Sequence, residues 1–209
     1  MKLAIIGSGR MGSAFATAFA TRTSHAVAVR GSHAKSGSAA ELVRELGITR
    51  ADDKALLSAD VVFVAVPPAA LSEVAADLKD YTGVVVSIIV PGAGGMTLAQ
   101  QGASAAEQLA ELLPKASVVT AFTSISSVLI RTPSSSDKPT VFTCADDENA
   151  RQTVIGLAED IGFEGVDAGL LAASGGVEHL GMIVFHLAYG AGLGNRVALR
   201  AYVAPAHGS

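Results

Sequence analysis

The chain begins with Met1-Lys-Leu-Ala-Ile-Ile-Gly7-Ser-Gly9-Arg-Met-Gly12, an apolar run that leads directly into a G-x-G-x-x-G turn. In a turn between a strand and a helix, the first glycine allows the tight bend. The second lets the backbone approach a pyrophosphate, and the third lets the helix pack closely on the strand. The stretch therefore predicts a dinucleotide-binding unit, and an ordinary strand-to-helix turn is the alternative. The expected helix carries apolar residues at helical spacing: Ala14, Phe15, Ala18 and Phe19.

Composition limits what this unit belongs to. The 209 residues are 50% hydrophobic and 16% charged, which suits one good-sized core or one domain with an added subdomain. The net charge of −4 and the scattered basic residues argue against binding to nucleic acid or to an anionic membrane surface.

Cysteine content and apolar runs indicate a cytoplasmic protein. The only cysteine, Cys144, excludes an internal disulfide and is expected to be a core residue. The run before Gly7 is too short for a signal peptide, and the apolar stretch 182–193 is shorter than the roughly 20 residues that span a bilayer. We expect no membrane segment.

Strand-like and helix-like segments alternate along the chain, which predicts an α/β fold with a Rossmann-type doubly wound parallel sheet. The segments 61–66 and 84–90 are apolar on both faces, as in a sheet covered by helices on both sides. Expected strands are 3–6, 26–29, 48–49, 61–66, 84–90 and 118–122, and expected helices are 13–22, 39–46, 53–58, 69–78 and 105–113.

The pattern loosens after Phe122 into polar stretches at 123–127 and 132–139. A strand at 140–144, a helix at 148–161 and a strand at 164–167 follow. A mostly apolar helix from 177 to 189 and a strand-like segment at 197–203 come last. We predict an NADP-binding Rossmann domain at 1–144, and a small C-terminal α/β subdomain at 145–209 that contributes to a second-substrate cleft and to dimer contacts.

The end of the expected second strand decides the type of dinucleotide. Arg30 lies a little over twenty residues beyond the glycine turn, where an NAD-specific fold normally carries an acidic residue. Arg30, with Ser32 and Lys35 close behind it, suits a 2′-phosphate instead, so NADP is favoured. A solvated basic loop is the alternative.

Other residues fall at the carboxyl ends of expected strands, where open α/β sheets bind their ligands. The backbone of Val64-Ala-Val-Pro-Pro68 is expected to line the cofactor cleft, although the prolines also punctuate a strand-to-helix junction. The glycine-rich segment 88–95 is a place where the backbone can pass close to a nicotinamide or to a second ring. Hydroxyl groups at the same edge, each equally explained as a turn residue, come from Thr123, Ser124, Ser126 and Ser127.

No catalytic acid/base set and no metal site is predicted. His179 and His186 lie seven residues apart, which is not the spacing of paired metal ligands on a helix. Acidic residues at 146–148 are explained as helix-capping groups. Reduction of a ketone or imine needs a proton donor, whereas hydride exchange between two ring cofactors needs none.

Several motifs together resemble the family of coenzyme F420-dependent NADP reductases, which are short Rossmann proteins that exchange hydride between NADP and a deazaflavin. The resemblance rests on Ile5–Gly12, on Ser104–Ala110 leading through Leu113-Pro114 to Val118–Phe122, and on Cys144–Asp147 followed by Val166–Leu170 and Val177-Glu178. It implies a Rossmann domain with a small C-terminal subdomain, as a homodimer.

The resemblance also implies roles for individual residues. It implies that the pyrophosphate is bound by Gly7, Ser8, Gly9, Arg10 and Met11, with Gly12 completing the turn. The 2′-phosphate would be bound by Arg30, Ser32 and Lys35. The adenosine-to-nicotinamide stretch falls to Ala65, Val66 and Pro67. The deazaflavin side falls to Val90, Pro91, the loop after Phe122 and the turn at 190–194.

The sequence is compatible with three functions. The favoured one is hydride transfer between NADP(H) and a flavin or a deazaflavin such as coenzyme F420, without a side-chain acid or base. The first alternative is an NADPH-dependent reductase of a small carbonyl or imine compound, for which the residues after Cys144 are few unless a second subunit completes the site. The second is a non-catalytic NADP-binding, redox-sensing module.

Overall fold

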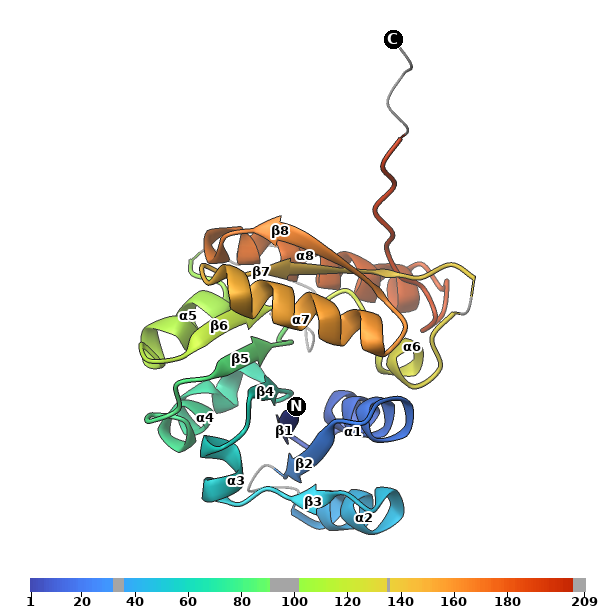
Figure 1. The fold of residues 1–209 in the computed structure, drawn as a ribbon. Coiled ribbons are helices and arrows are strands. Elements are labelled where there is room, and N and C mark those ends of the chain that lie inside the picture. The colour runs from blue at the N-terminus through green and yellow to red at the C-terminus, as the bar shows by residue number, and fades with distance from the viewer. Residues whose placement is uncertain (32–35, 91–101, 135, 205–209) are drawn as a thin grey trace.

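The computed structural model describes residues 1–31, 36–90, 102–134 and 136–204. An eight-stranded sheet runs through the molecule, with helices on both of its faces (Figure 1). The strands are β1 (Lys2–Ile6), β2 (Ala26–Arg30), β3 (Thr49–Arg50), β4 (Val61–Val64), β5 (Val84–Ser87), β6 (Ser117–Thr120), β7 (Thr140–Cys144) and β8 (Glu164–Gly169). Their order across the sheet is β3-β2-β1-β4-β5-β6-β7-β8.

The first six strands are parallel and have the order of a doubly wound Rossmann sheet. The predicted fold class is therefore confirmed. β7 runs antiparallel to β6 and pairs with it only at Thr120 and Cys144, and β8 is parallel to β7. The sheet thus continues on both sides of residue 144, and the division into domains at that residue stays a prediction.

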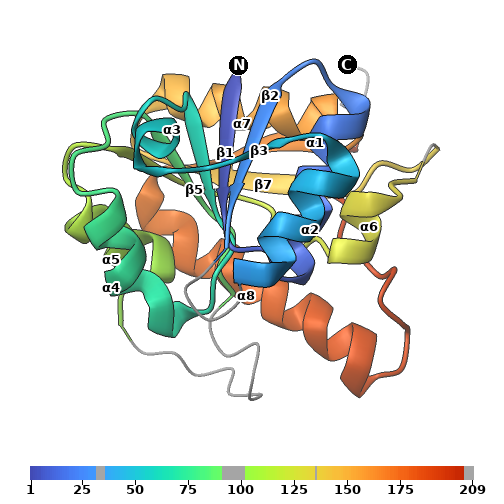
Figure 2. The same cartoon turned by 90° about the horizontal axis from the view of Figure 1, so that it is seen from below.

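Two groups of helices cover the two faces (Figures 1 and 2). One face is packed by α1 (Arg10–Arg22), α2 (Ser36–Leu46), α6 (Ser127–Arg131) and α7 (Glu148–Asp160). The other is packed by α3 (Asp53–Leu57), α4 (Leu71–Asp77), α5 (Ala105–Leu112) and two 3₁₀ turns, η2 (Pro68–Ala70) and η3 (Leu171–Ala173). The helix α8 (Ser174–Phe185) contacts α5, β6 and β7 and continues into one π-helical segment, η4 (His186–Gly190).

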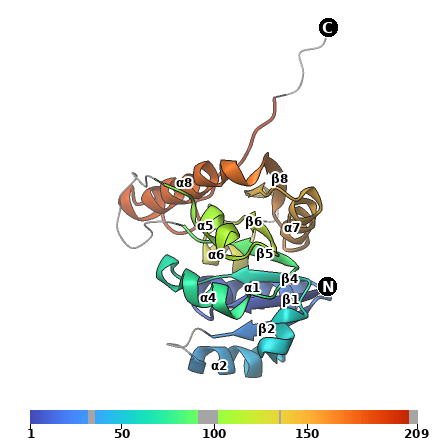
Figure 3. The ribbon, with the colours of Figure 1, turned by 90° about the vertical axis from the view of Figure 1, so that its left-hand side faces the viewer.

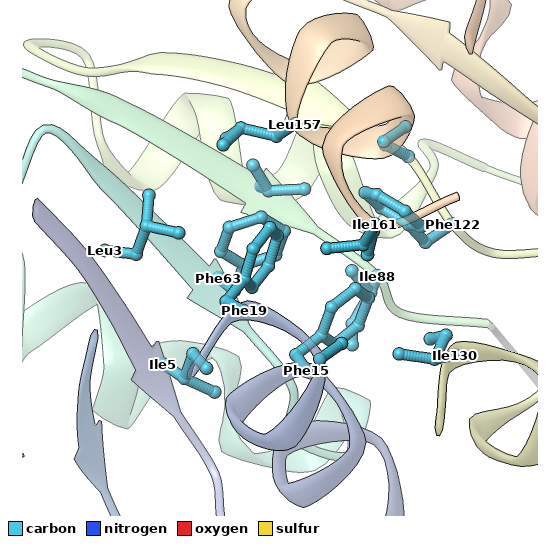
Figure 4. Packing of buried hydrophobic residues seen from close by; sticks show 14 of the residues in the cluster. Leu3, Ile5, Phe15, Phe19, Phe63, Ile88, Phe122, Ile130, Leu157 and Ile161 are labelled. Carbon is cyan, nitrogen blue, oxygen red and sulfur yellow. The ribbon is translucent and has the colours of Figure 1, made fainter. Parts of the chain in front are cut away.

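An aromatic cluster joins the first half of the chain to the second (Figure 4). The ring of Phe15 on α1 lies 5.1 Å from that of Phe63 on β4 and 5.0 Å from that of Phe122, which follows β6. Phe122 has a positive φ of 60°, a conformation that costs free energy for a bulky residue. Its ring is fully buried, so packing against Phe15 and Phe163 holds the strained backbone in place.

The expected strand at 197–203 is wrong. Within the described residues no strand forms there. The segment only passes the start of β7, where Thr140 N–H donates to the Leu199 carbonyl over 3.0 Å. This edge of β7 is open to Leu199 because β6 pairs with β7 only at the other end. Beyond it the chain leaves the sheet, and Tyr202 is 84% exposed.

Two helices also differ from expectation. α6 begins at the end of the polar stretch 123–127 and covers residues 128–131, for which no element is predicted, because five residues are too few to show helical periodicity. α8 begins at Ser174, before the expected start at Val177, and runs through Gly175 and Gly176. Glycine weakens a helix, so the pattern alone places the start too late.

The apolar C-terminal helical segment is longer than the sequence indicates. Residues Leu171–Gly190 form 20 continuous helical residues. An 18-residue stretch of them has a mean hydropathy of 1.2, which is enough by length and composition to cross a membrane. Of this stretch 44% is buried inside the protein, and the carboxyl group of Glu178 is also buried. A buried carboxyl group and contacts with two strands are typical of a helix that packs on its own sheet. The cytoplasmic location stays a prediction.

Arg22, the last residue of α1, ties together the ends of three helices. Its guanidinium donates to the Ile161 carbonyl over 3.0 Å and to the Ile130 carbonyl over 2.8 Å, and a further bond reaches the Arg131 carbonyl. These carbonyls lie at the C-terminal ends of α7 and α6, where backbone oxygens lack partners within the helix. One cation therefore satisfies carbonyls from two distant parts of the chain.

We expect Arg22→Met to lower the free energy of unfolding by about 2–4 kcal/mol, because hydrogen bonds to a charged group are lost and partly buried carbonyls remain without a donor. Denaturant titration followed by circular dichroism measures the change. Arg200→Met is the matched control, since Arg200 is 58% exposed and its ion pairs lie at the surface. Equal stability losses in the two variants would contradict the role of Arg22.

Candidate cofactor site

The glycine turn after β1 is held by its neighbours on both sides. Gly7 N–H donates to the Arg30 carbonyl over 2.8 Å, and Ala65 N–H donates to the Ile6 carbonyl over 2.8 Å. Gly7 has a φ of 107°, and a Cβ at this position would lie 2.3 Å from the Ala65 carbonyl oxygen. Only glycine fits this position.

The other two glycines of the turn have different environments. A Cβ on Gly12 would lie 1.8 Å from the Gly7 carbonyl oxygen, so α1 can pack on the turn only because Gly12 lacks a side chain. Gly9 has no heavy atom within 4 Å of its would-be Cβ. Its φ of −72° is also open to any residue. The fold therefore requires Gly7 and Gly12, whereas the space next to Gly9 is open for a ligand.

The N-terminus of α1 offers donors to that space. Gly9 is its N-cap and provides no side-chain hydrogen bond, and the first turn carries no acidic residue. Other helices are capped from within, as where Asp52, Ser126 or Asp147 accepts a backbone N–H of its own helix. The first N–H groups of any helix lack intrahelical partners and attract anions. The backbone of Gly9, Arg10 and Met11 therefore offers donors to an anion such as the predicted pyrophosphate, and Ser8 is buried beside the turn.

The predicted residues after β4 lie next to this turn. Ile6 and Val64 are register partners, so the chain leaves β1 and β4 side by side. The carbonyl of Ala65 and Cγ1 of Val66 both approach Gly7, at 2.3 and 3.3 Å from its would-be Cβ. Pro67 then caps the 3₁₀ turn η2 in an extended conformation. The structure thus brings Gly7, Ala65 and Val66 together at the carboxyl edge of the sheet.

Arg30 stands at the end of β2 with its guanidinium already bound to carboxylates. Its Nη1 lies 2.6 Å from Asp53 Oδ1, and its Nη2 lies 3.5 Å from Asp77 Oδ1. Sequence reasoning missed both partners, because they are 23 and 47 residues away. Ser32 and Lys35, which we expect to share the 2′-phosphate, fall outside the described residues.

A second group of predicted residues lies where α8 meets the sheet. A Cβ on Gly181 would lie 2.5 Å from the Thr123 carbonyl oxygen and 2.9 Å from Cγ2 of Val90. Thr123 Oγ1 also donates to the Val177 carbonyl over 2.9 Å. The loops after β5 and β6 are therefore pressed against α8, which extends past the carboxyl ends of the strands (Figures 2 and 3). Pro91 lies outside the described residues, and the turn at 190–194 follows η4.

Buried polar groups link α8 to α5 and the sheet. Thr120 Oγ1 donates to Ser174 Oγ over 2.9 Å. One helical turn along α8, the Glu178 carboxylate accepts the backbone N–H groups of Ala105 and Ala106, each over 3.1 Å. Glu178 thus caps the N-terminus of α5 from another helix. Its place in the Val177-Glu178 motif is visible in the sequence, but this partner is not.

The environments of two titratable groups argue for structural roles. Burial raises the pKa of Glu178 above its usual range, and the two backbone N–H donors oppose this shift. Burial also raises the pKa of the Cys144 thiol to about 11, which fits the predicted core residue rather than a nucleophile. Among residues 1–31, 36–90, 102–134 and 136–204, no three His, Cys, Asp or Glu side chains gather as metal ligands do.

Comparison with known protein families gives a match to the first part of the chain. The family described as NADP oxidoreductase, coenzyme F420-dependent, matches residues 2–91. This match covers less than half of the 209 residues. The matched residues contain the glycine turn, Arg30 and the segment after β4, so the predicted resemblance is confirmed over this part of the chain.

The similar proteins are reductases that act on different substrates by name. A solved structure from Arthrobacter assigned as an F420-dependent NADP reductase shares the fold, with a TM-score of 0.82, 23% identity, and coverage of 97% of this chain and 100% of its own. Mouse metalloreductase STEAP2 is 30% identical over 141 residues, which are 67% of this chain and 28% of STEAP2. Pyrroline-5-carboxylate reductase of Aquifex aeolicus is 37% identical over 91 residues, 43% of this chain and 34% of that enzyme. The chain thus matches about a third of the length of these two relatives.

The buried Glu178 carboxyl group gives a prediction for stability against pH. The pKa of a glutamate in an unfolded chain is about 4.3, and the pKa of Glu178 in the folded protein is higher. Its contribution to stability is full below the unfolded pKa and is lost as the pH rises through the folded pKa. We therefore expect the free energy of unfolding of the wild type, minus that of Glu178→Gln, to fall as the pH rises from about 4 to 7.

Urea unfolding at several pH values measures this difference. Glu111→Gln, on the exposed side of α5, corrects for the general pH dependence of a lost carboxylate. A difference that stays constant or rises with pH would show that the carboxyl group is not buried as described.

Proposed function

We propose that this protein transfers a hydride between NADP(H) and a flavin or deazaflavin acceptor of the coenzyme F420 type. The observation that carries the proposal is the open space at Gly9 beside the uncapped N-terminus of α1, in a turn whose other two glycines the fold requires. The family description, which names both NADP and coenzyme F420, supports it.

The residues divide the work between two neighbouring places. Backbone N–H groups at Gly9, Arg10 and Met11 would hold the pyrophosphate, and the guanidinium of Arg30 would hold the 2′-phosphate. The backbone from Ala65 to Pro67 would guide the cofactor along the edge of the sheet. When bound, the nicotinamide supplies or accepts the hydride.

The second place is the junction of Val90, Thr123 and α8, which we propose as the side of the acceptor. Val90 is partly exposed at this junction, whereas Thr123 is buried and its hydroxyl is already bonded to the Val177 carbonyl. Such a surface can orient a ring and exclude water, which is what hydride transfer between two cofactors requires. The shared sequence with a pyrroline-5-carboxylate reductase favours a small imine substrate as the second candidate.

Gly9→Ala tests the cofactor site with little effect on the fold. A methyl group at Gly9 meets no protein atom within 4 Å, so we expect the melting temperature to stay within about 2 °C, whereas NADPH binding weakens at least tenfold. Gly156→Ala on α7, which also has nothing within 4 Å, is the matched control and should bind normally. Isothermal titration measures binding, and normal affinity in Gly9→Ala would overturn the site.

The acceptor is tested by mixing wild-type protein and NADPH with oxidised coenzyme F420, FMN, FAD, a ferric chelate or pyrroline-5-carboxylate. We expect loss of NADPH absorbance with the deazaflavin or a flavin, and slower turnover by Gly9→Ala at an NADPH concentration below its dissociation constant. Turnover with pyrroline-5-carboxylate alone would favour the second candidate. Binding of NADPH without turnover of any acceptor would favour a redox-sensing module.

We also propose that two copies of the chain associate through α8, η4 and the turn at 190–194 that follows them. Large apolar side chains are exposed there, with exposed fractions of 44% for Ile183, 58% for Tyr189 and 63% for Leu193. Figure 3 shows this helical segment along the outside of the molecule. We expect a dimer mass by light scattering and a monomer mass for Ile183→Glu with Tyr189→Glu. A monomeric wild type would contradict the proposal.

A further inference from the structure

The backbone of Arg30 is held by the glycine turn, and its guanidinium is bound to two carboxylates. Its carbonyl accepts the Gly7 N–H over 2.8 Å, and it is the register partner of Ile6, so its Cα cannot move without the glycine turn. Its side chain is 21% exposed and lies between α3 and α4, the helices that carry Asp53 and Asp77. A ligand can therefore recruit only the guanidinium and not the backbone.

The two carboxylates use the guanidinium nitrogens that a phosphate would need. Asp53 takes Nη1 at 2.6 Å and Asp77 approaches Nη2 at 3.5 Å. Arginine binds phosphate best through two parallel N–H groups. A 2′-phosphate that binds through Nη1 and Nη2 therefore competes with both carboxylates for Arg30.

The two carboxylates lie in different electrostatic surroundings. Asp53 is 83% exposed and is the first residue of α3, where the helix dipole stabilises a negative charge. Asp77 is 24% exposed and is the last residue of α4, where the dipole destabilises it. Asp77 therefore depends more on Arg30 than Asp53 does, and drawing Arg30 away from it costs more.

We propose that Asp53 and Asp77 set the preference of this protein for NADP over NAD, by competing with the 2′-phosphate for the guanidinium of Arg30. The inference rests on the proposed NADP binding and adds two residues to its specificity. Without a 2′-phosphate, NAD leaves both ion pairs in place. The 2′-phosphate of NADP weakens one or both when it binds the same nitrogens, so the affinity for NADP is lower than Arg30 alone would allow.

The competition predicts tighter NADPH binding when a carboxylate is removed. We expect Asp53→Asn and Asp77→Asn each to lower the dissociation constant for NADPH about two- to fivefold, the size of an ion pair near the protein surface, with the larger effect for Asp77. The constant for NADH stays unchanged, and the gain shrinks at high salt. Asp80→Asn is the matched control, because Asp80 pairs with Lys115 at 3.0 Å and both side chains are 58% exposed.

A double-mutant cycle separates competition from simple repulsion. If the carboxylates act by holding Arg30, the gain from Asp53→Asn or Asp77→Asn disappears when Arg30→Gln is also present. If the gain persists without Arg30, the carboxylates repel the phosphate through space and the inference is overturned. Selectivity that rises only because NADH binds more weakly also overturns it, since the carboxylates would then accept the ribose hydroxyl.

Failure of this inference can be distinguished from failure of the proposed function. Failure of the wild type to bind either dinucleotide would overturn the proposed function itself. Normal NADPH binding with unchanged selectivity in both aspartate variants would overturn only the competition at Arg30.

Discussion

The close packing of α1 on the turn after β1 is the constraint on which the rest of the structure depends. The Gly7 carbonyl oxygen would lie 1.8 Å from a side chain at position 12, and the Ala65 carbonyl oxygen would lie 2.3 Å from one at position 7. Backbone therefore touches backbone at two points, and no rotamer change can relieve a substitution there. This contact sets the direction of α1. The helix carries Phe15 into the core and places Arg22, at its C-terminal end, beside the ends of α6 and α7.

From α1 the constraint extends to the later part of the chain. Phe15 meets Phe122, whose strained backbone places Thr123 against α8, and Arg22 satisfies carbonyls of α6 and α7. The two proposed ligand places are thus coupled through packing rather than through a shared polar network. The opposite face has its own polar link, in which Glu178 holds the N-terminus of α5 to α8.

Much of the fold was predictable because it is encoded locally. Runs of β-branched residues predict β4 and β5, and helical spacing predicts α1, α5 and α7 to within a few residues at their ends. The failures have equally local causes. α6 is too short for periodicity, Gly175 and Gly176 hide the start of α8, and the apolar stretch at 197–203 resembles a strand but meets the sheet at one residue.

The sequence by itself determined the Rossmann class, the glycine turn and the resemblance of residues 2–91 to the coenzyme F420-dependent NADP oxidoreductases, because a glycine turn and its flanking periodicities are read within a few dozen residues. Only the tertiary structure decided what surrounds that turn. It separated Gly9, which is open to a ligand, from Gly7 and Gly12, which the fold requires. It also placed Asp53 and Asp77 on Arg30. The physical reason is the strand order β3-β2-β1-β4, which brings α3 and α4 to one face of the sheet beside the end of β2, so that residues far apart in sequence share one guanidinium.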